Sequence, residues 1–417
     1  MKIQSFRLSA VLFLFTILSA CKNSDVADLK NGVWRATLKT ETGVEIPFNF
    51  ELADSAGIKY LDIINGKERF RVNEITQADD TILIQMPLFD SEIKAVLSGN
   101  KLTGKWVKHL ATKNVGMEFQ AEPNANWRFF KANESPAKVN LTGKWSTTFI
   151  TADEDKDTTL AIGQFTQEGS KLYGTFLTST GDYRFLEGTV SGDKFYLSCF
   201  DGCHAFLFSG KVSGDMITEG KMYSGYSGVE NWTAKKDENA VLPDAYSLVS
   251  LKPGLKSIDF TFNDLTGKPV SLKDQQFKNK VTVIQFFGSW CPNCMDETAF
   301  MVPFYNKYKD KGFAVIGLGY ERSTDVERAR TNIGRLKDRF QVPYPLLITG
   351  YINKPEEVIK SIPMLNAFMA FPTTIIIDKK GEVRKIHTGF SGPGTGKYYT
   401  EFAEEFEKLI QELLAEK

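Results

Sequence analysis

The chain has 417 residues, and at about 100–200 residues per domain this length suggests two to four domains. Lys and Arg together number 51, as do Asp and Glu, so the formal net charge is zero and no basic excess indicates a nucleic-acid partner. Hydrophobic residues make up 42% and charged residues 24%, which excludes a wholly disordered chain.

Residues 1–20 have the features of a secretory signal that is removed from the mature protein. Lys2 and Arg7 make the start positive, and the apolar run from Leu8 to Ile17 is too short to span a bilayer as a permanent helix. The run ends in Leu18-Ser19-Ala20-Cys21, which resembles the lipobox of bacterial lipoproteins. This resemblance implies that Cys21 is lipidated and anchors the protein in the cell envelope, periplasmic or outer-membrane associated. The alternative is an ordinary secretory signal that leaves Cys21 as a free thiol.

Residues 21–240 are predicted to be all-β, because short alternating runs are separated by turns rich in Gly, Asp, Asn and Ser. Three short motifs recur in the same order at spacings of 111, 111 and 116 positions. The pairs are Gly32-Val33-Trp34 with Gly143-Lys144-Trp145, Phe89-Asp90 with Phe200-Asp201, and Leu102-Thr103-Gly104-Lys105 with Thr218-Glu219-Gly220-Lys221. These recurring motifs predict a duplicated antiparallel region with copies at 21–130 and 131–240. Each copy is expected to be a barrel or sandwich of about eight strands. No nucleophile–base pattern appears there, which favours a spacer or a binding module.

Two cysteines lie close together in the second copy, at Cys199 and Cys203. Phe200-Asp201-Gly202 between them suits a three-residue hairpin turn, which would place the cysteines opposite each other across the strand ends. Opposed strand residues have Cα atoms about 4.5–5.5 Å apart, within the range that a disulfide accepts. The spacing therefore favours a Cys199–Cys203 disulfide, with two free buried thiols or a second redox site as alternatives.

The rest of the chain differs from the β region in composition and in its hydrophobic pattern. Residues 241–256 carry Pro and Gly among charged and small residues and are predicted to be a linker. Residues 257–417 alternate short β-branched runs with helical patterns, which is typical of an α/β domain. Strands are predicted at 258–262, 265–270, 281–287, 313–319 and 373–377, with a last strand ending at His387, and helices at 291–308, 325–340 and 398–416.

The strongest chemical signal is Trp290-Cys291-Pro292-Asn293-Cys294, which follows a buried strand and opens a helix. Thiol–disulfide exchange needs an attacking thiolate and a second thiol close enough to resolve the mixed disulfide. Cys291 at the helix N-terminus should have a depressed pKa, because the unpaired N–H groups and the dipole favour an anion. Cys294, one turn inside, should be the resolving thiol of a redox-active Cys291–Cys294 pair.

This motif resembles that of thioredoxin-like proteins, and more narrowly the TlpA/ResA group of extracytoplasmic thiol–disulfide oxidoreductases. The resemblance covers roughly residues 257–417 and includes three further features. They are Glu297 three residues after the second cysteine, Phe371-Pro372-Thr373-Thr374 in the place of the cis-proline loop, and the turn Asp378-Lys379-Lys380-Gly381. It implies an α/β thioredoxin-like fold after the β region.

The resemblance also implies roles for the residues around the cysteines. Glu297 would transfer protons to the pair, and Gln285, where thioredoxin has a buried Asp, cannot titrate. Pro372 would be cis, and Phe371 and Trp290 would bind the substrate. The plainer alternatives are a solvated Glu297, a trans Pro372 and a core Trp290.

No cofactor is implied, and no metal site is expected, because zinc needs four ligands and the chain has three histidines and a second cysteine pair in another domain. The sequence thus predicts a membrane-anchored reductase of protein disulfides, supplied with electrons by a membrane thiol carrier of the DsbD/CcdA type, as the resemblance implies. The alternatives are a β-domain binding module for an envelope ligand with a secondary redox domain, a disulfide oxidase or isomerase, and a peroxiredoxin-like enzyme.

Overall fold

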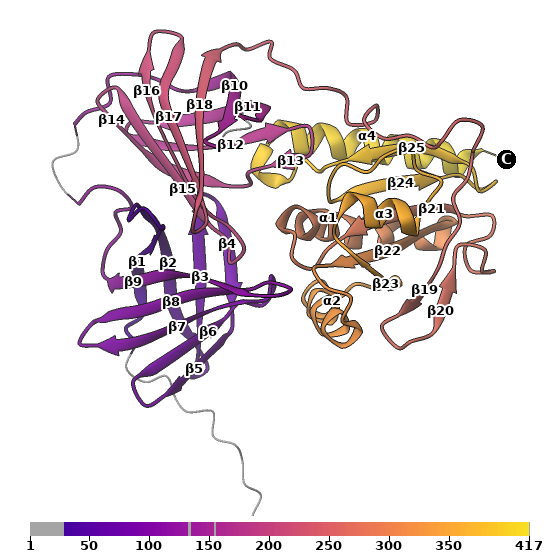
Figure 1. Ribbon diagram of the computed structural model, residues 1–417, viewed down its shortest axis with the longest axis horizontal. Coiled ribbons are helices and arrows are strands. Elements are labelled where there is room, and N and C mark those ends of the chain that lie inside the picture. Colours follow the sequence, from indigo (N-terminus) through magenta and orange to yellow (C-terminus); the bar gives the residue numbers. More distant parts are fainter. Residues whose placement is uncertain (1–28, 132–134, 154–155, 417) are drawn as a thin grey trace, which may run out of the picture.

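The computed structural model describes residues 29–131, 135–153 and 156–416. The predicted signal at 1–20 and the lipidation site Cys21 lie outside these residues. Two β units are followed by an α/β domain, which packs beside both of them (Figure 1). No helix in the described ranges is both long and apolar enough to cross a membrane.

The first β unit is a nine-stranded antiparallel sheet in the order β4-β3-β2-β1-β9-β8-β7-β6-β5. Its strands are β1 (Gly32–Lys39), β2 (Glu45–Ser55), β3 (Ile58–Asn65), β4 (Glu68–Val72), β5 (Glu74–Ala78), β6 (Thr81–Gln85), β7 (Ser91–Ser98), β8 (Lys101–His109) and β9 (Asn114–Pro123). The edge strands β4 and β5 are joined by Asn73 alone, so the backbone itself completes a barrel-like ring.

The second unit repeats this plan and closes by hydrogen bonds, because β11 pairs with both β10 and β12. Its strands are β10 (Gly143–Thr151), β11 (Thr158–Glu168), β12 (Lys171–Thr178), β13 (Gly181–Asp182), β14 (Leu186–Ser191), β15 (Lys194–Phe200), β16 (Ala205–Ser213), β17 (Met216–Ser224) and β18 (Gly228–Lys236). Its interior is filled by aromatic rings that are fully buried, among them Phe149, Phe176, Phe208 and Trp232. A core packed in this way argues against a ligand held inside the second barrel.

Equivalent residues of the two copies adopt the same local structure. Gly32 and Gly143 open the first strand of each copy with φ of 116° and 119°, a backbone region that is essentially restricted to glycine. Trp34 and Trp145 are buried, and each indole N–H donates to the carbonyl four residues earlier at 2.8 Å. The prediction of a duplicated, antiparallel, barrel-like region is confirmed.

The predicted Cys199–Cys203 disulfide is wrong, and both thiols are free and buried. In the β15–β16 hairpin Cys199 pairs with Phe206, and Phe200 pairs with Ala205. The connecting loop therefore has four residues, 201–204, and Cys203 lies within it rather than across from Cys199. Cys199 packs in the core of the second barrel, whereas Cys203 packs on the other side, with the first barrel and the α/β domain.

The α/β domain has a seven-stranded sheet in the order β20-β19-β23-β22-β21-β24-β25. Its elements are β19 (Thr261–Asp264), β20 (Pro269–Ser271), β21 (Val281–Phe287), α1 (Pro292–Tyr308), η1 (Lys309–Lys311), β22 (Phe313–Glu321), α2 (Val326–Phe340), β23 (Leu346–Ile352), α3 (Pro355–Ser361), β24 (Thr373–Ile377), β25 (Val383–Thr388), η2 (Pro393–Thr395) and α4 (Lys397–Ala415). The central strand β21 is buried along its whole length, and its alternate side chains pack on α1, α2 and α4 on one face and on α3 on the other. The fold is thioredoxin-like.

Four elements of this domain were not predicted, namely β23, α3 and the short helices η1 and η2. The first predicted strand begins three residues later than expected, at Thr261. Helix α3 spans seven residues, of which only Val358 is buried, so it is too short to show a helical period.

Replacing Phe176 by Ala should lower the free energy of unfolding by about 3–5 kcal/mol, because its ring is fully buried and lies within 6.0 Å of five other aromatic rings. Urea denaturation followed by tryptophan fluorescence measures the loss. Leu160→Ala, at a side chain that is 63% exposed on β11, is the control and should change stability by less than about 0.5 kcal/mol. Equal effects of the two substitutions would contradict this description of the core.

Candidate active site

Cys291 and Cys294 form a disulfide at the N-terminus of α1, with Cα atoms 5.2 Å apart. Cys291 is the N-cap residue, and its sulfur accepts a hydrogen bond from the Cys294 N–H at 3.2 Å. Pro292 occupies the first turn, where its missing N–H leaves no bond unmade. In the reduced state the free N–H groups of this turn can stabilise a Cys291 thiolate.

The loop before the cysteines is fixed by hydrogen bonds to the end of β22. The Ser289 N–H and hydroxyl donate to the buried Glu321 carboxylate at 2.9 and 2.8 Å, and the Trp290 indole donates to the Tyr320 carbonyl at 2.9 Å. The ring of Trp290 is half-buried and meets the ring of Phe371 edge-on, with centroids 5.6 Å apart. Trp290 therefore lies beside the cysteines at the rim of the domain rather than in its core.

The Phe371–Pro372 peptide bond is cis, as the resemblance implies. The Phe371 carbonyl lies 3.7 Å from the Cys291 sulfur. The tertiary structure thus brings together Trp290, Phe371, Pro372 and the two cysteines, which come from two segments about 80 residues apart.

Glu297 is buried below the cysteines, with 1% of its surface exposed, so the alternative of a solvated helix residue is wrong. Its carboxylate accepts hydrogen bonds from the Gln285 amide at 2.7 Å and from the Thr374 hydroxyl. Burial raises the pKa of Glu297 to about 7, although these two hydrogen bonds oppose the rise. A carboxyl group with this pKa can accept or donate a proton near neutral pH.

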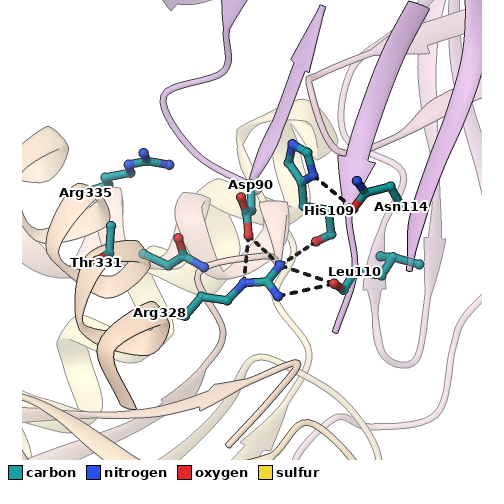
Figure 2. Close-up of a pocket in the computed structure, with 8 residues that line it drawn as sticks. Asp90, His109, Leu110, Asn114, Arg328, Thr331 and Arg335 are labelled. Atoms are coloured by element: carbon teal, nitrogen blue, oxygen red, sulfur yellow. Dashed lines mark hydrogen bonds and ion pairs between the residues drawn. The ribbon is translucent and has the colours of Figure 1, made fainter. Parts of the chain in front are cut away.

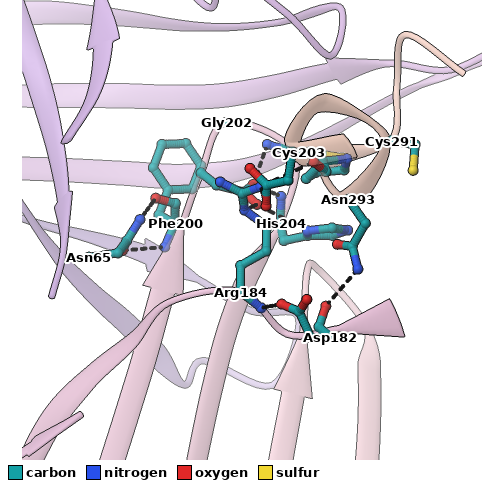
Figure 3. Close-up of polar contacts among 12 residues, drawn as sticks. Asn65, Asp182, Arg184, Phe200, Gly202, Cys203, His204, Cys291 and Asn293 are labelled. Atoms are coloured by element: carbon teal, nitrogen blue, oxygen red, sulfur yellow. Dashed lines mark hydrogen bonds and ion pairs between the residues drawn. The ribbon is translucent and has the colours of Figure 1, made fainter. Parts of the chain in front are cut away.

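The second barrel also reaches the cysteine motif, which was not anticipated from the sequence (Figure 3). The Asn293 amide donates to the Asp182 carbonyl at 3.2 Å, and the Asp182 carboxylate accepts from the Gly392 N–H at 2.7 Å. Gly389 approaches the β12–β13 turn so closely that a Cβ atom there would lie 2.6 Å from the Thr180 carbonyl carbon. Residues 180–182 thus contact both the cysteine loop and the loop that follows β25. Cys291 exposes only 6% of its surface.

Cys203 is a third thiol in this neighbourhood (Figure 3). It donates to the Trp290 carbonyl at 3.2 Å, and the Lys108 ammonium lies 3.3 Å from its sulfur. Burial alone would raise the pKa of Cys203, but the charges of His204 and Lys108 outweigh it and lower the pKa to about 6. His204 is itself held by Asp201, 3.2 Å away. The sequence signal for this cluster is the run Asp201-Gly202-Cys203-His204.

The corresponding loop of the first barrel contacts the α/β domain at a second place (Figure 2). Asp90, 111 positions before Asp201, pairs with Arg328 of α2 at 2.7 Å, and Arg328 also donates to the carbonyls of His109 and Leu110. A pocket of about 390 Å³ lies beside this pair, with Arg335 on its wall. Neither Cys291 nor Cys294 lines this pocket. Among the described residues, no group of three or more His, Cys, Asp or Glu side chains is arranged to hold a metal ion.

Fold and site together define a thioredoxin-fold protein with a redox dithiol, and comparison with known proteins agrees. Residues 252–401 match the Redoxin family. ResA, a thiol-disulfide oxidoreductase of Halalkalibacterium halodurans, is 26% identical over 140 residues, which cover 33% of this chain and 69% of that protein. ResA of Geobacillus thermodenitrificans is 30% identical over 138 residues, or 33% and 69% of the two chains. The thioredoxin-like protein YneN of Bacillus subtilis is 29% identical over 141 residues, or 34% and 74%.

The chain belongs to the TlpA/ResA-like thiol–disulfide oxidoreductases of the thioredoxin superfamily. It is therefore an enzyme of thiol–disulfide exchange. Each of these relatives matches about a third of the chain, and the family match lies at residues 252–401.

Glu297→Gln should change how stability depends on pH. The pKa of Glu297 is raised from 4.5 to about 7, so between these values the unfolded chain loses the proton while the folded protein keeps it. The free energy of unfolding of the wild type therefore falls as the pH rises through this window. The variant lacks this loss, so its stability relative to the wild type should rise by about 3 kcal/mol between about pH 4.5 and pH 8. Urea denaturation at a series of pH values measures the difference, and a constant difference would show that Glu297 titrates like an exposed carboxyl.

Proposed function

We propose that this protein is a membrane-anchored, extracytoplasmic reductase of disulfides in envelope proteins, tethered through a lipid on Cys21. The observation that carries the reductase proposal is the Cys291–Cys294 pair at a helix N-terminus above a buried glutamate whose pKa is about 7. The lipobox-like sequence before Cys21 supports the anchor and the compartment. Clients are then exported proteins, which acquire disulfides in an oxidising compartment.

In the reduced enzyme, the Cys291 thiolate attacks one sulfur of a client disulfide. A bond forms between Cys291 and that sulfur, the client disulfide breaks, and its other sulfur leaves as a thiolate that takes up a proton. The Cys294 thiolate then attacks Cys291, which forms the Cys291–Cys294 disulfide and releases the second client thiol. Glu297 accepts the Cys294 proton, because it lies one helical turn further along α1 and is poised near neutral pH.

Client binding uses the rim beside Cys291. Trp290 and Phe371 are half-buried aromatic residues with part of each ring open to a partner. The cis-proline loop offers backbone groups to an extended peptide, a form of strand addition. After each turnover the Cys291–Cys294 disulfide must be reduced again, and we assign this step to a membrane thiol carrier of the DsbD/CcdA type.

The reduction potential of the full chain decides between a reductase and an oxidase or isomerase. Equilibration with glutathione or dithiothreitol buffers should give a value at or below that of thioredoxin, about −270 mV. A value near that of DsbA, about −120 mV, would contradict the reductase proposal and indicate an oxidant.

Cys291→Ser should abolish insulin reduction, because the attacking thiolate is lost. Cys294→Ser should accumulate mixed disulfides with clients, because the resolving thiol is lost, and non-reducing gels of envelope extracts would show them. Cys199→Ala is the matched control, since Cys199 is buried in the second barrel and away from the motif. Insulin reduction by Cys291→Ser at the rate of the control would overturn the assignment.

A further inference from the structure

Arg184 is the residue at which the three parts of the protein meet. It follows β13, has a left-handed backbone with φ of 57°, and exposes 2% of its surface. Its guanidinium forms ion pairs with Glu68 of the first barrel, Asp201 of the second barrel and Asp296 of α1. Figure 3 shows Arg184 in the cluster that contains Asp182, Cys203 and Asn293.

The same guanidinium also touches the cysteine motif directly. Its Nη1 donates to the carbonyl of Pro292, the residue between Cys291 and Asn293, at 3.1 Å. Asp296, its partner on α1, lies two residues after Cys294. A buried charge is tolerated only when it is paired and hydrogen-bonded, so these contacts hold the first turn of α1 in a fixed position against the β region.

A second buried arginine provides a comparison within the same chain. Arg128 is 6% exposed and pairs with Glu187 at 3.0 Å, and it also donates to the Ile64 carbonyl and to Ser198. All of these partners belong to the two barrels. Arg128 therefore joins barrel to barrel without reaching the α/β domain, whereas Arg184 joins both barrels to the turn that carries the cysteines.

We propose that Arg184 is a positioning residue of the Cys291–Cys294 pair, through which the β region fixes the first turn of α1 and supplies a positive charge that favours the reduced dithiol. This inference rests on the proposed dithiol chemistry. It assigns to the β region a part in setting the redox equilibrium of the domain beside it.

The sign of the effect follows from the charges around the turn. Arg184 faces the carboxylates of Glu68, Asp201 and Asp296, so removing its charge takes positive charge away from the helix N-terminus, and a rise in the pKa of Asp296 on losing its partner offsets only part of this loss. The lost positive charge destabilises the Cys291 thiolate and favours the disulfide. Removing the charge of Asp296 instead leaves Arg184 less neutralised and favours the dithiol.

The test compares three variants of the full chain, equilibrated with glutathione buffers at pH 8, with the dithiol fraction read by thiol alkylation and mass spectrometry. At this pH Asp296, whose pKa is about 7, is charged in the wild type. Arg184→Met should shift the equilibrium constant about tenfold toward the disulfide, which corresponds to about 30 mV for a two-electron couple. Asp296→Asn should shift it in the opposite direction, and Arg128→Met should shift it less than about twofold.

Opposite shifts for Arg184→Met and Asp296→Asn identify the charge as the cause, because a purely structural ion pair would give shifts of the same sign when either partner is removed. Shifts of the same sign, or shifts no larger than that of Arg128→Met, would overturn the proposal. If Arg184→Met does not fold, Asp296→Asn decides: a shift toward the dithiol supports the proposal, and no shift or the reverse overturns it. A wild type with no reversible dithiol equilibrium would instead overturn the proposed function itself.

Discussion

The buried guanidinium of Arg184 is the interaction on which the arrangement of the protein depends. A positive charge that exposes 2% of its surface needs anionic partners, and here they come from the first barrel, the second barrel and helix α1. The β region is therefore bound to the α/β domain at the turn that holds the cysteines, in addition to the contact that Asp90 makes with Arg328 of α2.

That placement links two features of the active site. The first turn of α1 carries the Cys291–Cys294 pair, and it is also the surface that the second barrel contacts through Asn293 and Pro292. The second barrel therefore covers the turn that it fixes, and Cys291 exposes only 6% of its surface. Trp290 and Phe371 remain half-buried beside Cys291 at the edge of this contact.

The duplication gives the β region two equivalent loops that contact the α/β domain. The loops that contain Asp90 and Asp201 occupy equivalent places in the two copies, and each pairs its aspartate with an arginine. The first copy reaches α2 of the redox domain, and the second reaches the cysteine motif through Arg184 and Cys203. The same loop therefore contacts a different part of the α/β domain in each copy of the β unit.

The sequence by itself determined the features that depend on neighbours in the chain. The dithiol at a strand-to-helix junction, the Gly-x-Trp opening of each β copy and the periodic helices are local signals, and Glu297 needs only its place on the same helix. The tertiary structure alone decided the features that depend on distant partners. Cys199 and Cys203 stay unpaired because a four-residue loop sets the hairpin register, and Arg184 meets Asp296, 112 residues away, because a buried charge takes its partners from wherever packing brings them.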